Sequence, residues 1–278
     1  MARGWLVTGC SSGLGRAVAE AAAAAGDTVI AGVRRPEALA DLADRYPDRI
    51  VPVVLDVREP AHCEAAVGAA VELLDGLDVL VNNAGNGLFG AVEEVGDAEL
   101  RDQLETLVVG PWRLARLALP VMRGQGGGHI VNVSSLAGRM AFPGLAAYVT
   151  GKYALEGMTQ ALAVEAAPFG IRVTAVEPGG YATRYGSSLT DAADRSAHYR
   201  ELTEPMRDQL RVLAELPGVG RPEDFARLLL RIVAEPGPLP VRIPVGPDSL
   251  AFVSAAGEAA AAELEAVRTL LREPSAPH

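Results

Sequence analysis

The sequence predicts a doubly wound α/β fold, a three-layer sandwich in which helices cover both faces of a central parallel sheet. Short apolar runs alternate along the chain with longer helical stretches, which is typical of strand–helix–strand units. Right-handed crossovers between parallel strands then wind the sheet in both directions. A glycine-rich turn, Thr8-Gly-Cys-Ser-Ser-Gly-Leu-Gly15, marks the point where the first strand passes into the first helix.

Six apolar runs are expected to form buried strands, at residues 5–7, 28–33, 50–57, 79–81, 129–134 and 171–177. A seventh run at 241–245 is a candidate final strand. Helices are expected at 15–25, 36–46, 60–74, 97–122, 146–167 and 222–234. Gly26 is a good stop for the first helix, and Gly110-Pro111 should bend the long one.

The pattern loosens after Pro178-Gly179. Residues 181–216 are polar and mixed, with helical pieces at 192–213 and no strand signal. An amphipathic helix is expected at 255–271, and residues 273–278 should fray. Neither an internal repeat nor a linker rich in Pro, Gly or Ser divides the chain, so a single domain over 1–278 is predicted.

Composition narrows the classes of protein. The chain has 278 residues, 49% hydrophobic and 22% charged, with a formal charge of −10. A nucleic-acid surface needs clustered Lys and Arg, which this balance disfavours. Two isolated cysteines and four scattered histidines predict neither a disulfide framework nor a metal site. Because no signal peptide and no apolar run of ~18 residues is present, a cytoplasmic protein without a membrane role is expected.

The glycine turn is suited to a dinucleotide pyrophosphate. Gly9, Gly13 and Gly15 leave room for backbone N–H groups to approach phosphate oxygens, and a helix N-terminus adds a partial positive charge. The spacing is GxxxGxG rather than GxGxxG. The alternative is a turn made tight only for strand–helix packing.

The end of the second strand indicates which dinucleotide. A carboxylate there would accept hydrogen bonds from a ribose 2′-OH, whereas arginine suits a 2′-phosphate. This chain has Arg34 and Arg35, and no carboxylate before Glu37. NADP(H) is therefore favoured over NAD(H), the alternative being that both arginines simply begin an exposed helix.

Ser135, Tyr148 and Lys152 are the candidate catalytic residues. Tyr148 and Lys152 are four apart, so on a helix they share a face. A cation at about 4 Å is worth roughly 4 kcal/mol at an effective dielectric of ~20, enough to lower a phenol pKa by about three units before desolvation is counted. Such a phenol exchanges a proton with a carbonyl or alcohol oxygen, and Ser135 donates a hydrogen bond to the same oxygen. The alternative for the Tyr–Lys pair alone is a surface helix pair.

With these residues in order, the chain resembles the short-chain dehydrogenase/reductase family over nearly its whole length. The matching segments are Thr8 to Gly15, Asp56-Val57, Asn82-Asn-Ala-Gly85, Ser135, Tyr148 with Lys152, and Pro178-Gly179. The resemblance implies a Rossmann-type fold with about seven parallel strands, an extended nicotinamide cofactor, and a homodimer or homotetramer. It also implies that 181–216 forms the substrate-binding lid.

The resemblance further implies cofactor contacts. Asp56 would bind the adenine amine, Asn82 the adenosine region, and Lys152 the nicotinamide ribose hydroxyls. Thr183 would hold the carboxamide or pyrophosphate, and Arg34 matches the basic position of NADP-preferring members. The full set of cofactor-binding residues is Gly9, Ser11, Ser12, Gly13, Leu14, Arg34, Asp56, Val57, Asn82, Ala84, Gly85, Tyr148, Lys152, Pro178, Gly179 and Thr183.

One position departs from the family pattern. Members usually carry Asn in an N-x-x-G segment after NNAG, where it holds a water in a proton relay that reaches the active-site lysine. Here Leu107-Val-Val-Gly110 places Leu107 there, and leucine cannot hydrogen-bond. We hypothesise that Ser135, Tyr148 and Lys152 still suffice for hydride transfer.

The expected function is NADP(H)-dependent reduction of a carbonyl, or oxidation of the matching secondary alcohol, on a small and apolar substrate; this is a ketoreductase activity. Leu107, Phe142, Tyr181 and Tyr185 are the candidate substrate contacts, although lid residues could equally serve ordinary packing. Two alternatives remain: the same fold running a non-redox cyclisation or isomerisation, motivated by Leu107, and a non-catalytic NADP-binding regulator.

Overall fold

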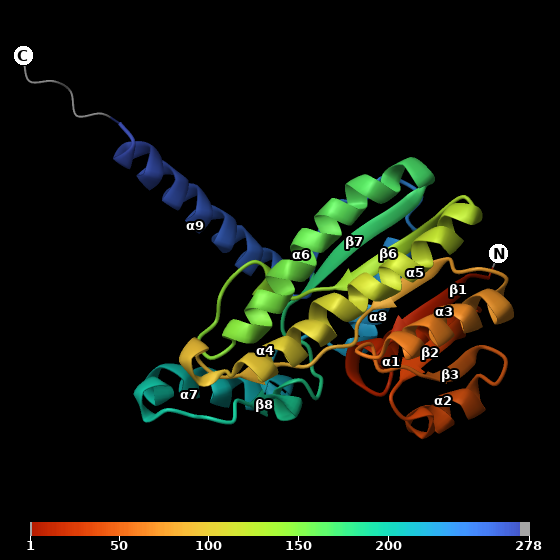
Figure 1. Cartoon of the computed structure of the whole chain (residues 1–278), viewed down its shortest axis with the longest axis horizontal. Coiled ribbons are helices and arrows are strands. Elements are labelled where there is room, and N and C mark those ends of the chain that lie inside the picture. Colours follow the sequence, from red (N-terminus) through yellow and green to blue (C-terminus); the bar gives the residue numbers. More distant parts are fainter. Residues whose placement is uncertain (1, 273–278) are drawn as a thin grey trace, which may run out of the picture.

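Seven parallel strands form the central sheet of the computed structural model, which describes residues 2–272. In spatial order they are β3 (Ile50–Val54), β2 (Thr28–Val33), β1 (Gly4–Thr8), β4 (Val79–Asn82), β6 (Gly128–Val133), β7 (Ile171–Pro178) and β9 (Arg242–Val245). Every neighbouring pair is parallel. The predicted fold class is confirmed, and the candidate strand at 241–245 is real (Figure 1).

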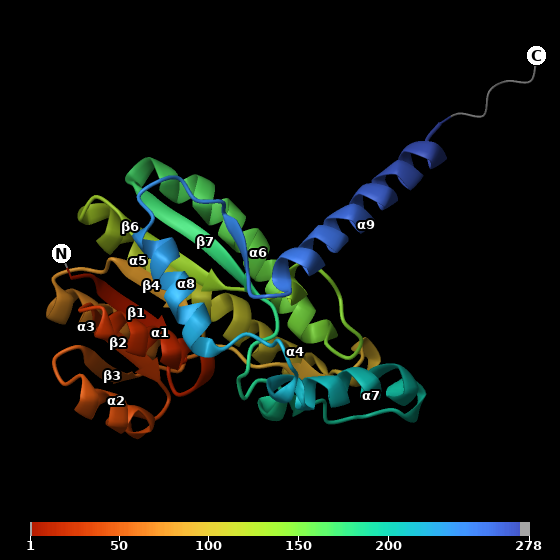
Figure 2. The same cartoon turned by 180° about the vertical axis from the view of Figure 1, so that it is seen from behind.

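Helices cover both faces of this sheet. One face carries α1 (Gly13–Ala24) and α8 (Pro222–Ala234), and the other carries α3 (Pro60–Leu74), α5 (Gly110–Gly124) and α6 (Ala146–Ala166). Figure 1 is seen from the side of α3, α5 and α6, and Figure 2 from the side of α1 and α8. The short α2 (Ala40–Arg45) lies beside β3 at the sheet edge.

Side-chain alternation explains the two layers. In β1, Trp5 and Val7 pack into the core under α1 and α8, whereas Leu6 packs into the core under α3 and α5. Val29 and Ile30 divide in the same way in β2. Because successive side chains of a strand point to opposite faces, fully apolar runs are required where both faces are covered.

The order of the strands places a site at one edge of the sheet. The chain winds outward from β1 in one direction and from β4 in the other. In open α/β sheets ligands bind outside the carboxyl ends of the strands at this switch point. Thr8 ends β1 and Asn82 ends β4, so the glycine turn and the Asn82–Gly85 segment meet there.

The long helix expected at 97–122 is interrupted. It consists of α4 (Asp97–Leu104), a π-helical turn (Glu105–Val109) and α5. Pro111 has no N–H to offer the carbonyl of Leu107, and its ring crowds that carbonyl. The helix widens before the proline, and Gly110 N–H donates to the Glu105 carbonyl instead. The bend therefore precedes Gly110-Pro111 and contains Leu107.

Two other expectations need correction. The strand expected at 50–57 ends at Val54. The segment 181–216 was expected to hold no strand, yet β8 (Thr190–Asp191) pairs with β5 (Leu88–Phe89) ahead of α7 (Ala197–Arg211). Backbone pairing to a distant partner creates this strand, which local sequence cannot reveal.

The C-terminal helix differs in extent and in surroundings. α9 (Ser249–Leu270) begins before the expected residue 255 and projects away from the body (Figures 1 and 2). Ser249 is its buried residue. The expected fraying at 273–278 lies outside the described residues.

Candidate active site

The glycine turn is built for close approach. Gly9 and Gly13 adopt positive φ angles of 71° and 59°, which glycine adopts without steric cost. A Cβ on Gly15 would stand 2.3 Å from the Asn83 amide nitrogen. The first turn of α1 contains no acidic residue, and Ser12 at its N-cap makes no side-chain capping bond. The N-terminus of α1 is therefore suited to an anion such as a pyrophosphate.

Thr8 and Asn83 fix this turn, and neither was among the residues predicted from sequence. Thr8 Oγ1 accepts the backbone N–H groups of Asn83 and Ala84 at 2.9 and 2.8 Å. The Asn83 amide donates to the carbonyls of Thr8 and Gly9. The second Asn of the Asn-Asn-Ala-Gly segment was the available signal, since a side-chain amide can satisfy the exposed carbonyls of a tight turn.

Asn82, in contrast, lies inside the sheet. It is buried and donates to Asn132 Oδ1 on β6 at 2.8 Å, and Asn132 donates in turn to Thr159 on α6. Asn82 therefore ties β4 to β6, and the expected adenosine contact would have to come from its backbone or from its neighbours Ala84 and Gly85. Gly85 packs against Leu107.

Asp56, Val57 and Arg34 lie past the ends of β2 and β3. Asp56 accepts the Arg58 guanidinium at 2.7 Å, and that contact holds the pKa of the Asp56 carboxyl below its usual range. Val57 is buried, and its carbonyl accepts from Arg113. Arg34 is exposed, close enough to Asp56 to contribute to its lowered pKa.

The remaining cofactor candidates gather at the glycine turn. Thr183 lies against Gly13, with its Cβ 3.4 Å from where a Gly13 Cβ would stand. Pro178 ends β7, and Gly179 N–H donates to the Val245 carbonyl. Ser11 is exposed, while Ser12 and Leu14 are half-buried. The turn, Pro178-Gly179 and Thr183 thus share one edge of the sheet.

Ser135, Tyr148 and Lys152 come together at the same edge. Ser135 follows β6, and Tyr148 and Lys152 lie one turn apart on α6. Tyr148 is 9% exposed and Lys152 is 5% exposed. Lys152 Nζ lies 5.6 Å from the centre of the Tyr148 ring and donates to the Val133 carbonyl at 2.8 Å. Lys152 is the only lysine in the chain.

The expected acidic phenol is wrong for this structure. Burial raises the pKa of Tyr148, and the nearby Ser135 and Tyr185 hydroxyls offset only part of that rise. Burial also lowers the pKa of Lys152 to about 8. Desolvation disfavours both charged forms, and the ammonium lies beside the Tyr148 ring and donates to a backbone carbonyl. Tyr148 is therefore protonated at neutral pH.

Leu107 fills the space between two glycines. It is 1% exposed, and its side chain lies 2.9 Å from where a Gly85 Cβ would stand and 2.8 Å from that of Gly151. It belongs to an apolar cluster around Tyr148 with Phe89, Ala137, Leu145 and Leu189. Leu107 is therefore a packing residue, and the absence of side chains at Gly85 and Gly151 leaves space for it.

The segment 181–216 covers this cluster. Tyr185, Leu189, Met206 and Leu210 pack against it, as does Phe142 from the other side. The Tyr185 ring centre lies 5.5 Å from that of Tyr148. Of the four expected substrate contacts, Leu107, Phe142 and Tyr185 meet here.

Tyr181 does not reach the cluster. It packs edge-on against Phe225 of α8 at 5.5 Å, in the core on the opposite face of the sheet. Gly220 and Gly246 make room for its ring. The expectation of a substrate contact at Tyr181 is therefore not met.

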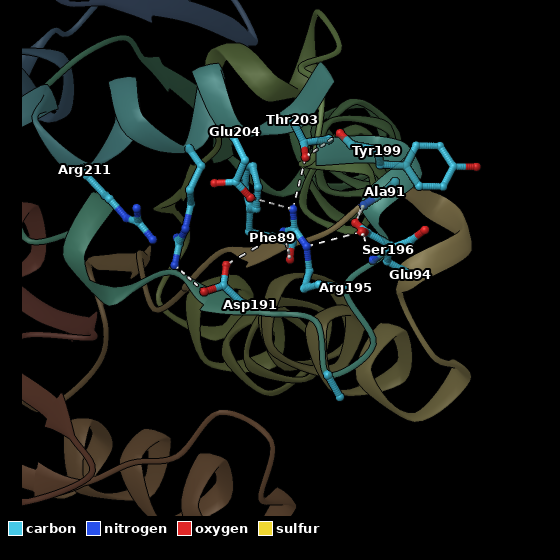
Figure 3. Close-up of polar contacts among 12 residues, drawn as sticks. Phe89, Ala91, Glu94, Asp191, Arg195, Ser196, Tyr199, Thr203, Glu204 and Arg211 are labelled. Atoms are coloured by element: carbon cyan, nitrogen blue, oxygen red, sulfur yellow. Dashed lines mark hydrogen bonds and ion pairs between the residues drawn. The ribbon is translucent and has the colours of Figure 1, made fainter. Parts of the chain in front are cut away.

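A cluster of polar contacts, here called the latch, joins residues 191–207 to the residues around Phe89 and Glu94 (Figure 3). It comprises Phe89, Glu94, Asp191, Arg195 and Arg207. The guanidinium of Arg195 lies 5.0 Å from the Phe89 ring centre and that of Arg207 lies 5.3 Å from it. Arg195 Nε contacts the buried Glu94 at 3.3 Å, and Arg207 contacts Asp191 at 2.7 Å.

Two further properties hold for residues 2–272. None of the helices there is long and apolar enough to cross a membrane. Within the same residues, no three His, Cys, Asp or Glu side chains come together as a metal-binding group.

Comparisons with known proteins agree with this geometry. The family model described as short chain dehydrogenase matches residues 4–194. Oxidoreductase BOA17 of Botryotinia fuckeliana is 37% identical over 271 residues, covering 97% of this chain and 98% of that protein.

Solved structures give the same answer. A short-chain dehydrogenase from Streptomyces avermitilis superposes with a TM-score of 0.89 at 42% identity, over 97% of each chain. A short-chain dehydrogenase/reductase from Burkholderia phymatum in complex with NAD superposes with a TM-score of 0.81 at 26% identity, over 100% of this chain and 98% of that one. The chain therefore belongs to the short-chain dehydrogenase/reductase family of oxidoreductases, whose members use a nicotinamide cofactor.

Proposed function

We propose that this protein is an NADP(H)-dependent ketoreductase that reduces a carbonyl group on a small, apolar substrate, or oxidises the matching secondary alcohol. The observation that carries the proposal is the buried group of Ser135, Tyr148 and Lys152 beside a glycine turn with positive φ angles. The family membership supports the redox chemistry.

The chain fits a nicotinamide dinucleotide. Because Gly9, Gly13 and Gly15 have no side chains, a pyrophosphate can approach the backbone of the turn closely. The N-terminus of α1 offers it N–H groups. When bound, the nicotinamide supplies or accepts the hydride. Lys152 is the candidate partner of the nicotinamide ribose hydroxyls, and Thr183 of the carboxamide or pyrophosphate.

Proton transfer falls to Tyr148. Its raised pKa keeps the phenol protonated at neutral pH, so Tyr148 Oη can donate a proton to a carbonyl oxygen that gains negative charge. Ser135 Oγ donates a hydrogen bond to the same oxygen. A protonated phenol favours reduction over oxidation, because oxidation needs the phenolate as base.

The lid and the apolar cluster set the substrate class. Phe142, Leu189, Met206 and Leu210 surround Tyr148 with hydrocarbon. A hydrocarbon wall binds lipid-like or polycyclic carbonyl compounds better than charged ones, because burial of an unpaired charge is costly. We therefore propose that residues 181–216 act as the substrate lid, with Tyr185 and Phe142 as substrate contacts.

The deciding experiment measures NADPH oxidation at 340 nm against a panel of apolar ketones and aldehydes. Wild type should turn over at least one of them, and Tyr148→Phe should lower kcat by 10²-fold or more. Tyr153→Phe is the matched control, since that exposed ring lies on the same helix. Product formation from a carbonyl panel without Tyr148-dependent NADPH loss would instead favour the non-redox alternative.

The cofactor preference rests on Arg34. We expect NADPH to bind more tightly than NADH in a fluorescence titration, because a guanidinium pairs with a 2′-phosphate. Arg34→Ser should weaken NADPH binding about tenfold, since a charged hydrogen bond is worth roughly 1.5–3 kcal/mol, and should leave NADH nearly unchanged. Arg35→Ser is the control. Equal loss for both nucleotides would contradict the 2′-phosphate contact.

We also propose that the chain works as a homodimer or homotetramer. α9 exposes a row of apolar side chains, among them Leu264, Val267 and Leu270, the last 82% exposed. Most helical stability in proteins comes from tertiary packing of an apolar face, so a second copy is the proposed cover. Light scattering after size exclusion tests this, and a monomer at micromolar concentration would contradict it.

A further inference from the structure

Lys152 occupies an unusual electrostatic position. Its ammonium is buried, and within residues 2–272 its hydrogen bond goes to a neutral partner, the Val133 carbonyl. Burial disfavours the charged form of a lysine. Some other group must help to keep this amine protonated near neutral pH.

Glu156 lies one helical turn further along α6. It is 1% exposed, and its Oε2 accepts Arg242 Nε at 3.0 Å. Its Oε1 lies close to the buried hydroxyl of Ser134, and this contact offsets part of the rise in the pKa of Glu156 that burial causes. Of the residues that the structure describes, Arg242 is the one charged side chain within ion-pair distance of Glu156.

The side chains of Lys152 and Glu156 lie against two consecutive residues at the end of β6. Lys152 holds the Val133 carbonyl, and Glu156 lies beside Ser134, the next residue. A Cβ on Gly138 would stand 2.8 Å from Ser134 Oγ and 3.2 Å from Glu156 Oε1, so the absence of a side chain at Gly138 makes room for this carboxylate. Lys152 and Glu156 thus flank the end of β6 from the same face of α6.

A second carboxylate stands behind Glu156. Glu177 on β7 is fully buried and pairs with Arg139 at 3.0 Å. The charged groups around Glu156 are therefore Lys152 on its own helix, Glu177 on β7, Arg242 on β9 and Arg139 after β6. Burial and the charge of Glu177 raise the pKa of Glu156.

We propose that Glu156 is a positioning residue, the buried counter-charge that keeps Lys152 protonated and so keeps an ammonium beside Tyr148. This role rests on the proposed function of Lys152 and Tyr148. The geometry carries the proposal. Lys152 and Glu156 are four residues apart on one face of α6, and both are buried. Lys152 contacts Val133 and Glu156 lies beside Ser134, two consecutive residues at the end of β6. The carboxylate also opposes the burial that lowers the pKa of Lys152.

The single lysine makes a direct test possible. Protein labelled with ¹³C at the lysine ε-carbon gives one side-chain signal, whose shift against pH reports the pKa of Lys152 without substrate or cofactor. Glu156→Gln keeps the shape and removes the charge. It should lower the pKa of Lys152 by about one pH unit, as expected for loss of an opposite charge one helical turn away in a partly screened site. Glu156→Asp should restore part of the shift.

Glu177→Gln is the matched control. It removes an equally buried carboxylate, but it also removes repulsion at Glu156, so the pKa of Lys152 should stay or rise. An unchanged pKa in Glu156→Gln would overturn the proposal. So would an equal fall in both glutamine variants, because that would show general loosening of the cluster.

The pH dependence of turnover should distinguish the two glutamine variants in the same way. In NADPH oxidation, the alkaline fall of kcat/KM should move to lower pH in Glu156→Gln and not in Glu177→Gln. Absence of any Tyr148-dependent turnover would count against the proposed function alone, since the lysine titration still decides the role of Glu156.

Discussion

Leu107→Asn tests how this chain uses the position where its family usually carries asparagine. Leu107 is 1% exposed and fits between Gly85 and Gly151. Losing the buried leucine should cost about 2–3 kcal/mol, and burying an amide among Phe89, Leu145 and Leu189 adds about 1–3 kcal/mol if it finds no partner. We expect the free energy of unfolding to fall by about 3–6 kcal/mol, with a fall in Tm of ~10 °C.

Activity should respond differently from stability. If Ser135, Tyr148 and Lys152 suffice for proton transfer, kcat of the folded variant should stay level or rise, because an amide near Lys152 offers the relay a hydrogen-bonding group. The assays are thermal unfolding by circular dichroism and NADPH oxidation at a temperature where both proteins are folded. Leu107→Met, which conserves volume and polarity, should lose less than about 1.5 kcal/mol.

Two outcomes would refute the reasoning. A Tm equal to that of wild type would show that the asparagine finds partners or solvent, so the packing argument would fail. A kcat well below that of Leu107→Met would show that leucine shapes the substrate pocket, and the non-redox alternative would gain.

Two further substitutions probe the burial of charge. Lys152→Met should abolish activity and yet raise stability at pH 7 by about 3 kcal/mol. The folded lysine has its pKa lowered to about 8, so burial of the ammonium opposes folding fully below pH 8. This penalty is relieved as pH rises from 8 towards the unfolded value of 10.5, and the gain should vanish there in chemical denaturation; a stability gain that ignores pH would contradict it. Glu94→Gln should cost about 2 kcal/mol at pH 7 and raise KM more than it lowers kcat, because Glu94 accepts N–H groups of Ala91 and Ser196 as well as Arg195. These bonds outweigh burial and lower the pKa of Glu94, so the difference from wild type should shrink as pH falls through that pKa. Glu93→Gln, on the exposed side of the same turn, is its control, and equal effects of the two would argue against the latch.

Much of the fold and the outline of the site could be predicted from local sequence. Apolar runs on strands covered by helices, glycines at positive φ and a Tyr–Lys spacing of one helical turn are all properties of short segments. The seven-stranded sheet and the family were therefore predicted and confirmed. The meeting of Ser135 with Tyr148 was expected from the family pattern, and it depends on Ser135 following β6 and Tyr148 lying near the start of α6.

Other features depend on segments far apart in sequence. Whether Asn82 or Asn83 shapes the turn depends on Asn132 across the sheet, and whether Tyr181 or Tyr185 faces Tyr148 depends on where α8 packs. The latch joins Glu94 to Arg195, about a hundred residues further along the chain.

The sequence by itself determined which groups this protein has for chemistry and at which edge of the sheet they stand. Only the tertiary structure decided their charge states, because a pKa depends on how deeply the surrounding segments bury the group. Side chains of residues 185–210 and of α6 bury the phenol of Tyr148 and hold it protonated, and burial also lowers the pKa of Lys152. The spacing of residues along the chain predicts neither pKa shift, because desolvation depends on which distant segments pack around the group.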